Sequence, residues 1–215
     1  MSIPAISPYP MPVDPVNNRV TWLPDPRRAA LLVHDMQAYF LNKFDRAQSP
    51  VPALVANASA LRELCAAAGV PVFYTAQPQE QAADDRALLN DFWGPGLTDP
   101  RFHAEQPIID ELAPRAGDVV LTKWRYSAFQ RSDLAEQLRA LGRDQLIVCG
   151  IYAHIGCMAT ALEAFMRDIQ PFLVIDAVAD FSLAEHRMAV DYVSRRCGAS
   201  LTLAQVRAAL QQATP

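Results

Sequence analysis

Short, continuous apolar runs recur along the chain and dominate its hydrophobic pattern. Runs of this kind are typical of parallel strands that are covered on both faces. The pattern therefore predicts six strands, at residues 29–33, 70–74, 118–121, 145–149, 171–175 and 199–203.

Stretches with a helical repeat separate these runs. Residues 52–68 and 134–141 each end at a glycine, which is the usual residue after a helix C-terminus. Ser182 lies three residues before Glu185, a spacing that predicts a capping box and a helix to about residue 195. A last helix is expected at 205–212. The β-α alternation predicts an α/β fold with three αβα layers and a mostly parallel sheet of about six strands.

The length and the prolines indicate how the chain is organised. A chain of 215 residues with 51% hydrophobic residues is long enough to bury a large core in one domain, here residues 1–215. The first 27 residues are rich in proline and are expected to form an extended arm on the surface.

Charge and cysteine usage exclude several classes of protein. Nineteen basic and 23 acidic residues give a net charge of −4 without a basic stretch, so a nucleic-acid or membrane partner is not expected. There is neither an apolar run of about 20 residues nor a signal-peptide pattern, which favours a cytoplasmic protein. The four cysteines are widely spaced, and neither they nor the four histidines suggest a metal site.

Polar residues follow the first three predicted strands, and a turn with glycines follows the fourth. Asp35 follows the first, Gln77 the second and Lys123 the third, and a turn with Gly150 and Gly156 follows the fourth. Ligands of such sheets bind beyond the carboxyl ends of the strands. Asp35 alone would be read as a turn residue and Lys123 alone as a solvated strand end, but together they indicate an acid–base pair for a small-molecule substrate.

Longer motifs carry a family resemblance. The sequences LLVHDMQAYF (31–40), LTKWRYSAF (121–129) and GRDQLIVCGIYAHIGC (142–157) resemble the isochorismatase-like hydrolase family. YTAQP (74–78), LLNDFWGPG (88–96) and DIQPFLVIDAVADFS (168–182) extend the likeness to nearly the whole chain. The similarity is strongest to the branch with the isochorismatases of siderophore pathways and the phenazine-pathway hydrolase of 2-amino-2-deoxyisochorismate.

The resemblance implies a role for individual residues. Asp35 and Lys123 match the catalytic pair, and Gly156 falls where most of the superfamily has a nucleophilic cysteine. A cis peptide bond is expected between Ile151 and Tyr152. The residues that match the substrate-binding groups are Gln77, Arg86 and Tyr152, and those that match the aromatic lining of the pocket are Trp93, Phe40, Tyr126 and Phe129. Without the resemblance, Arg86 would be read as an exposed helix charge.

The implied reaction needs a general acid and no enzyme nucleophile. Protonation of the terminal CH₂ carbon of an enolpyruvyl ether gives an oxocarbenium-like cation, to which water adds to release pyruvate. The second product is a trans-dihydro-dihydroxybenzoate or trans-2,3-dihydro-3-hydroxyanthranilate. Asp35 is the candidate acid, although an ordinary aspartate has a pKa near 3.9 and a neighbouring Lys123 lowers it further. Burial and the carboxylates of the substrate would have to raise that pKa.

Two other functions stay open. An amide hydrolase could use Cys157, but this residue lies one position beyond the nucleophile and is expected to point into the core. Strand alternation likewise predicts that His34 points away from Asp35. A non-catalytic module that docks to synthetases or other pathway proteins is the second alternative. The resemblance also implies a homodimer without a cofactor, and no aryl carrier segment is found in the sequence.

Overall fold

One parallel sheet organises the computed structural model, which describes residues 3–212. Its six strands are in the order β3-β2-β1-β4-β5-β6, and every neighbouring pair is parallel. The predicted α/β architecture is confirmed. The strands are β1 (Ala29–His34), β2 (Val72–Ala76), β3 (Val119–Thr122), β4 (Gln145–Ile151), β5 (Gln170–Ala179) and β6 (Ala199–Leu201).

The strand boundaries differ from the predicted ones where a turn or a cap overrides the apolar pattern. β2 begins two residues late, because Gly69 ends the preceding helix with a φ of 67° and Pro71 has no N–H to donate. β6 ends early, because the Thr202 hydroxyl accepts a hydrogen bond from the Gln205 N–H and starts the last helix. β5 extends four residues beyond its predicted end.

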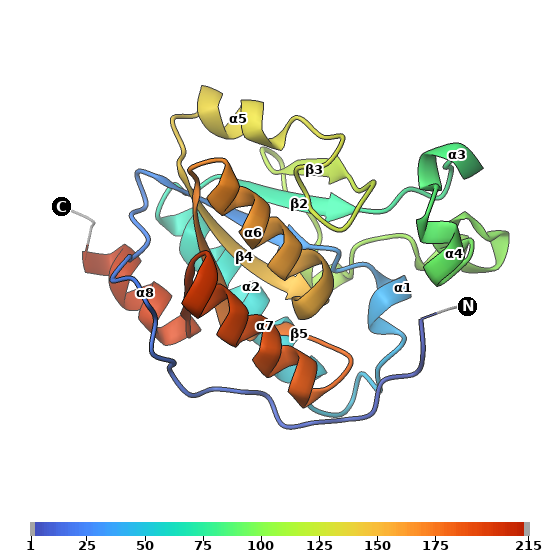
Figure 1. The fold of residues 1–215 in the computed structure, drawn as a ribbon, viewed down its shortest axis with the longest axis horizontal. Helices are drawn as coiled ribbons and strands as arrows, with labels where there is room; N and C mark the ends of the chain where they lie inside the picture. The colour runs from blue at the N-terminus through green and yellow to red at the C-terminus, as the bar shows by residue number, and fades with distance from the viewer. Residues whose placement is uncertain (1–2, 213–215) are drawn as a thin grey trace.

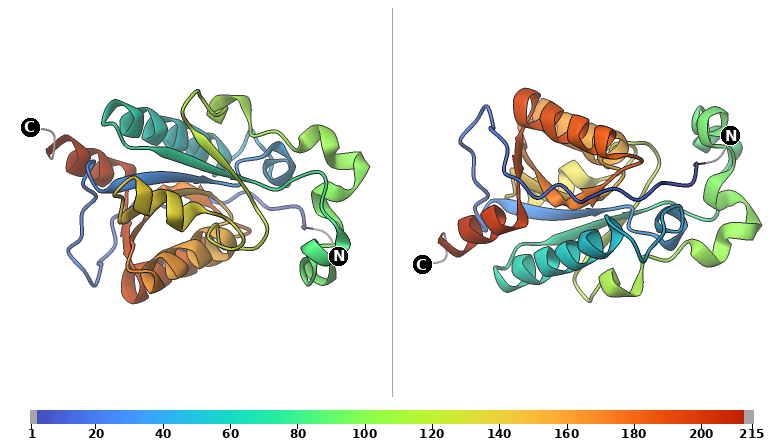
Figure 2. Two further views of the ribbon diagram at one scale, coloured as in Figure 1. Left: turned by 90° about the horizontal axis from the view of Figure 1, so that it is seen from above. Right: turned by 90° about the horizontal axis from the view of Figure 1, so that it is seen from below.

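Helices cover both faces of the sheet (Figures 1 and 2). Helices α2 (Val51–Ala67) and α8 (Leu203–Gln212) lie on one face, and α5 (Leu134–Ala140), α6 (Met158–Met166) and α7 (Leu183–Arg196) lie on the other. Ser182 caps α7, since its hydroxyl accepts from the Glu185 N–H at 3.2 Å, as the sequence predicted. Strand residues therefore alternate between two cores.

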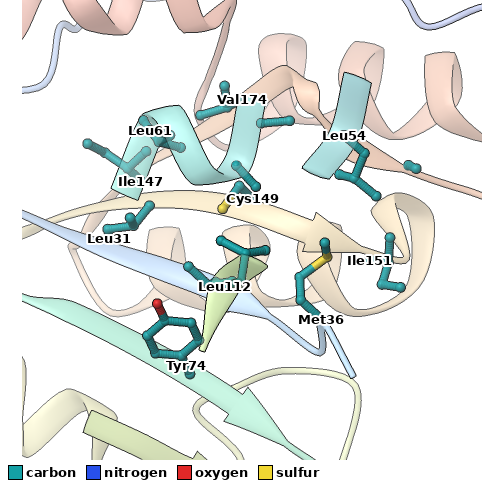
Figure 3. Close-up of a cluster of buried hydrophobic side chains, with 14 of the residues drawn as sticks. Leu31, Met36, Leu54, Leu61, Tyr74, Leu112, Ile147, Cys149, Ile151 and Val174 are labelled. Atoms are coloured by element: carbon teal, nitrogen blue, oxygen red, sulfur yellow. The ribbon is translucent and has the colours of Figure 1, made fainter. Parts of the chain in front are cut away.

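The core on the α2 side is shown in Figure 3. Leu54 and Leu61 of α2 pack against Leu31 of β1 and Val174 of β5, and all four side chains are fully buried. This packing fixes the strands whose carboxyl ends form the site.

Several short elements gather beyond the carboxyl ends of the strands, and they were not predicted (Figure 1). They are too short for a helical repeat to be recognised in the sequence. The elements are α1 (Ala38–Leu41), α3 (Ala83–Arg86), α4 (Leu89–Trp93), two 3₁₀ turns (Gly96–Thr98 and Pro100–Glu105) and one π-helical turn (Ala153–Cys157). A third 3₁₀ turn (Asp110–Leu112) packs on α2 instead, where the Ser59 hydroxyl donates to the Glu111 carbonyl. No helix among residues 3–212 is both long and apolar enough to cross a membrane.

Residues 3–28 contain neither a helix nor a strand of the sheet. This segment crosses the molecule in an extended path (Figure 2). Its backbone is tied at both ends, since the Ile6 N–H donates to the Lys43 carbonyl and the Arg19 N–H to the Ser194 carbonyl.

Candidate active site

Asp35 lies directly after β1 at the carboxyl edge of the sheet. Its backbone has a φ of 49°, in the left-handed region that aspartate tolerates better than most residues. Its N–H donates to the Thr75 hydroxyl at 3.0 Å, and that hydroxyl donates to Asp35 Oδ1 at 2.5 Å. Thr75, at the end of β2, therefore fixes both the backbone and the carboxylate of Asp35.

Lys123 holds the other carboxylate oxygen. Its Nζ lies 3.0 Å from Asp35 Oδ2, and its own N–H donates to the Ala76 carbonyl. Asp35 and Lys123 are only 6% and 5% exposed, so this is a buried ion pair. Burial alone would raise the pKa of Asp35, but the charge of protonated His34, the Lys123 ammonium and the Thr75 hydroxyl outweigh it and keep the pKa below its ordinary value.

The turn after β4 faces this pair. The peptide bond between Ile151 and Tyr152 is cis, as the resemblance implied. The N–H groups of Ile155, Gly156 and Cys157 all point at the Tyr152 carbonyl, at 3.1–3.2 Å. None of these three donors is therefore aimed at a substrate oxyanion.

Gln77 borders the same pocket from the end of β2. Its backbone is held by Gln37, whose side chain is fully buried and accepts from the Gln77 N–H at 2.7 Å. The Gln37 amide also donates to the Gln77 carbonyl at 3.0 Å. Gln37 is thus a positioning residue that the sequence did not single out, although it follows Asp35 by two positions.

Arg86 lines the same pocket and is 4% exposed. Its Nε donates to the Gly94 carbonyl at 2.7 Å, and a Cβ at Gly96 would lie 2.7 Å from its Nη2. Burial lowers the pKa of this guanidinium, and no carboxylate among residues 3–212 forms an ion pair with it. The reading as an exposed helix charge is therefore wrong; it is Asp85 that pairs at the surface, with Arg131.

Aromatic side chains close the pocket. Trp93 Nε1 donates to the Tyr126 hydroxyl at 3.0 Å, and the Tyr152 hydroxyl donates to the Phe40 carbonyl at 2.9 Å. The Phe181 ring contacts Tyr152 with 4.6 Å between centroids. Trp93, Phe40, Tyr126 and Tyr152 all border the pocket, which Phe181 joins without having been predicted.

Two predictions about individual side chains are corrected. Phe129 does not border the pocket: it is buried in the core on the α6 side, with the Arg167 guanidinium 5.2 Å above its ring. His34 does not point away from Asp35, because the left-handed φ of Asp35 breaks the strand alternation. His34 Nδ1 lies 3.7 Å from Asp35 Oδ2, and the ring borders the pocket.

Cys157 points into the core, as expected. It is fully buried, and burial raises the pKa of its thiol well above the ordinary value. Such a thiol is inert as a nucleophile at neutral pH. No cluster of three histidine, cysteine, aspartate or glutamate residues suited to a metal occurs among residues 3–212.

Comparison with known proteins supplies the remaining evidence. The isochorismatase domain model matches residues 29–205. The chain is 59% identical over 199 residues to an isochorismatase of Bacillus subtilis (strain 168), covering 92% of this chain but 63% of that protein. It is 50% identical over 206 residues to phenazine biosynthesis protein PhzD1 of Pseudomonas aeruginosa, covering 95% of this chain and 98% of that protein. The solved structure of a cysteine hydrolase from Pseudomonas syringae has a TM-score of 0.79 at 26% identity, over 90% of this chain and 97% of that one.

Proposed function

Because this chain belongs to the isochorismatase family of hydrolases, we propose that it hydrolyses the enolpyruvyl ether of isochorismate or of 2-amino-2-deoxyisochorismate. The observation that carries the proposal is the buried Asp35–Lys123 pair, which faces a pocket lined by a buried arginine without an ion-pair partner and by no cysteine, serine or threonine. Such a pocket suits a dicarboxylate that reacts by proton transfer.

Asp35 acts as the general acid. Its carboxyl proton goes to the terminal CH₂ carbon of the enolpyruvyl group, and the electron pair of the C=C bond forms the new C–H bond. Water then adds to the oxocarbenium carbon and forms a hemiketal, while Asp35 takes up the proton that water releases. Collapse of the hemiketal breaks the bond between this carbon and the ether oxygen, which leaves as the ring hydroxyl with a proton, and releases pyruvate.

The charges of the bound substrate raise the pKa of Asp35 enough for it to hold the proton. In the free site Lys123 keeps the pKa of Asp35 low. Two substrate carboxylates beside the pair add negative charge, which raises the pKa of a neighbouring carboxyl. Arg86 takes one carboxylate in a bidentate contact, and Lys123 offsets the charge of the other. Gln77, Trp93, Phe40, Tyr126 and Tyr152 orient the ring.

The absence of a side chain at Gly156 fits this chemistry. A vinyl ether that is activated by protonation reacts with water directly, so it needs no covalent enzyme intermediate. The oxyanion donors that an acyl transfer requires are also missing from residues 155–157, because all three N–H groups donate to the Tyr152 carbonyl. An amide hydrolase with a cysteine nucleophile is therefore disfavoured.

The test is pyruvate release, measured with lactate dehydrogenase on both substrates. The wild type is expected to turn over at least one of them, and Asp35→Asn is expected to lose at least about 10³-fold in kcat, because it removes the proton donor. Asp84→Asn is the matched control, since Asp84 is exposed. The ratio of kcat/KM for the two substrates identifies the pathway. No release from either substrate would refute the proposal.

The family also implies a homodimer that acts in the cytoplasm alone or with synthetases of its pathway. Light scattering of the purified chain tests the dimer. Unchanged turnover in Asp35→Asn would instead favour a role as a docking module.

A further inference from the structure

Gly156 is confined by one neighbour. A Cβ built at this position would lie 2.6 Å from Nε2 of His34 and closer still to Cε1, and its third contact is Nδ1 of the same ring at 3.0 Å. Gly156 does not have a φ in the left-handed region, so its backbone would accept a side chain. The constraint at 156 is therefore the space that the His34 imidazole occupies.

The imidazole is fixed in this space. His34 is 1% exposed, its Nδ1 is 2.8 Å from the Ile151 carbonyl, and its Nε2 is 3.4 Å from the Tyr126 carbonyl. The backbone of His34 is fixed as well, because β1 pairs it with Gly150 of β4. Neither the ring nor its strand can retreat without breaking the hydrogen bond to Ile151 or the pairing of β1 with β4.

Three parts of the site meet at this ring. His34 immediately precedes Asp35, Ile151 begins the turn that contains Gly156, and Tyr126 lies three residues after Lys123. Burial lowers the pKa of His34 to about 4, so the ring is neutral at pH 7. A neutral imidazole has one N–H, and the distances assign it to the 2.8 Å contact.

We propose that His34 is the residue that specifies the nucleophile-free form of this site. Its ring occupies the place that any side chain at 156 would need, so a cysteine cannot enter there by a single substitution. Its hydrogen bond to Ile151 also holds the turn at a fixed distance from Asp35. Only the chemical reason for keeping 156 empty rests on the proposed function; the packing itself does not.

A double-mutant cycle tests the steric part. His34→Asn keeps a donor near the position of Nδ1 and removes Cε1 and Nε2, the two ring atoms that a Cβ at 156 would meet first. Gly156→Ala in the wild-type background overpacks a buried position and is expected to lower Tm by at least about 5 °C. In the His34→Asn background the same substitution is expected to lower Tm by less than about 2 °C.

A thiol probe gives a second readout that does not depend on turnover. The four native cysteines are all buried, so the folded wild type is expected to consume no iodoacetamide. The double variant His34→Asn/Gly156→Cys is expected to fold and to react at one thiol per chain, because residue 156 borders the pocket. The single variant Gly156→Cys is expected to yield little folded protein.

Activity measurements distinguish a His34 side chain that positions the turn at Ile151 from one that only fills space. His34→Val removes the donor to Ile151 and is expected to lower kcat at least about tenfold with KM changed less than about threefold, while His34→Asn recovers most of kcat. An equal fall in Tm on Gly156→Ala in the wild-type and His34→Asn backgrounds would overturn the proposal. A double variant that fails to fold although His34→Asn folds would overturn it too. If only the proposed function were wrong, the wild type would release no pyruvate, but Gly156→Ala would still lower Tm less in the His34→Asn background than in the wild type.

Discussion

Removing the Lys123 ammonium would leave Asp35 as an unpaired buried carboxylate. The ion pair is 3.0 Å long and both side chains are almost fully buried, so little solvent reaches the carboxylate that loses its partner. Breaking a buried pair of this kind costs about 3–5 kcal/mol of unfolding free energy. For a chain of this length we therefore expect Lys123→Met to lower Tm by roughly 6–20 °C at pH 7.

The loss of Tm in Lys123→Met should depend on pH in a defined direction. In the wild type the pKa of Asp35 is below its value in the unfolded chain, so the pair stabilises the protein above that value and the contribution is lost as pH falls. In Lys123→Met the folded pKa of Asp35 is expected to rise, because burial raises it and the Lys123 ammonium no longer lowers it. The destabilisation is then largest near pH 8 and shrinks toward pH 4, where Asp35 becomes neutral.

Thermal unfolding between pH 4 and pH 8 measures this effect. Lys43→Met is the matched control, because Lys43 lies over the Tyr39 ring and forms no ion pair among residues 3–212. Adding Asp35→Asn to Lys123→Met should recover much of the lost Tm at pH 7, since the unpaired charge is gone. A Tm loss that is small at pH 7, or equal at every pH, would refute the buried ion pair.

Three further predictions concern catalysis. Arg86→Gln should raise KM about 10- to 150-fold with little change in kcat, because a charge-assisted contact to the substrate is lost; steady-state kinetics beside the surface variant Arg131→Gln check it. Cys157→Ala should keep kcat within about twofold, since its thiol stays protonated in the core; abolished activity would revive the cysteine mechanism. Because free Asp35 must gain a proton to act as the acid and its pKa is low, kcat/KM should fall about tenfold per pH unit from pH 5 to pH 8, and kcat less steeply; a rate that rises with pH would contradict an acid role.

The strands could be predicted from the sequence because burial on both faces leaves an uninterrupted apolar signal. That signal ends where local hydrogen bonds decide the conformation, as at Pro71 before β2 and Thr202 after β6. The short helices around the pocket could not be predicted, since elements of three to six residues are set by tertiary packing. Arg86, which these short helices bury, could be predicted as a site residue only through the family resemblance.

Only part of the site could be predicted from the residues that follow the strands. Asp35, Gln77 and Lys123 border one pocket, as expected from the parallel order of β1, β2 and β3. Thr75 was missed because a threonine in a strand is ordinary, and its role appears only when the β1–β2 register places it beside Asp35. The orientation of His34 was misjudged because strand alternation holds only while the backbone stays extended.

The central claim is that water attacks the enolpyruvyl carbon and leaves the bond between the ring and the ether oxygen intact. Turnover of isochorismate in H₂¹⁸O, with mass spectrometry of both products, tests this claim most directly. The account predicts a ring product without ¹⁸O and pyruvate that carries the label. Label in the ring hydroxyl would place the attack on the ring carbon and would contradict protonation of the vinyl ether by Asp35.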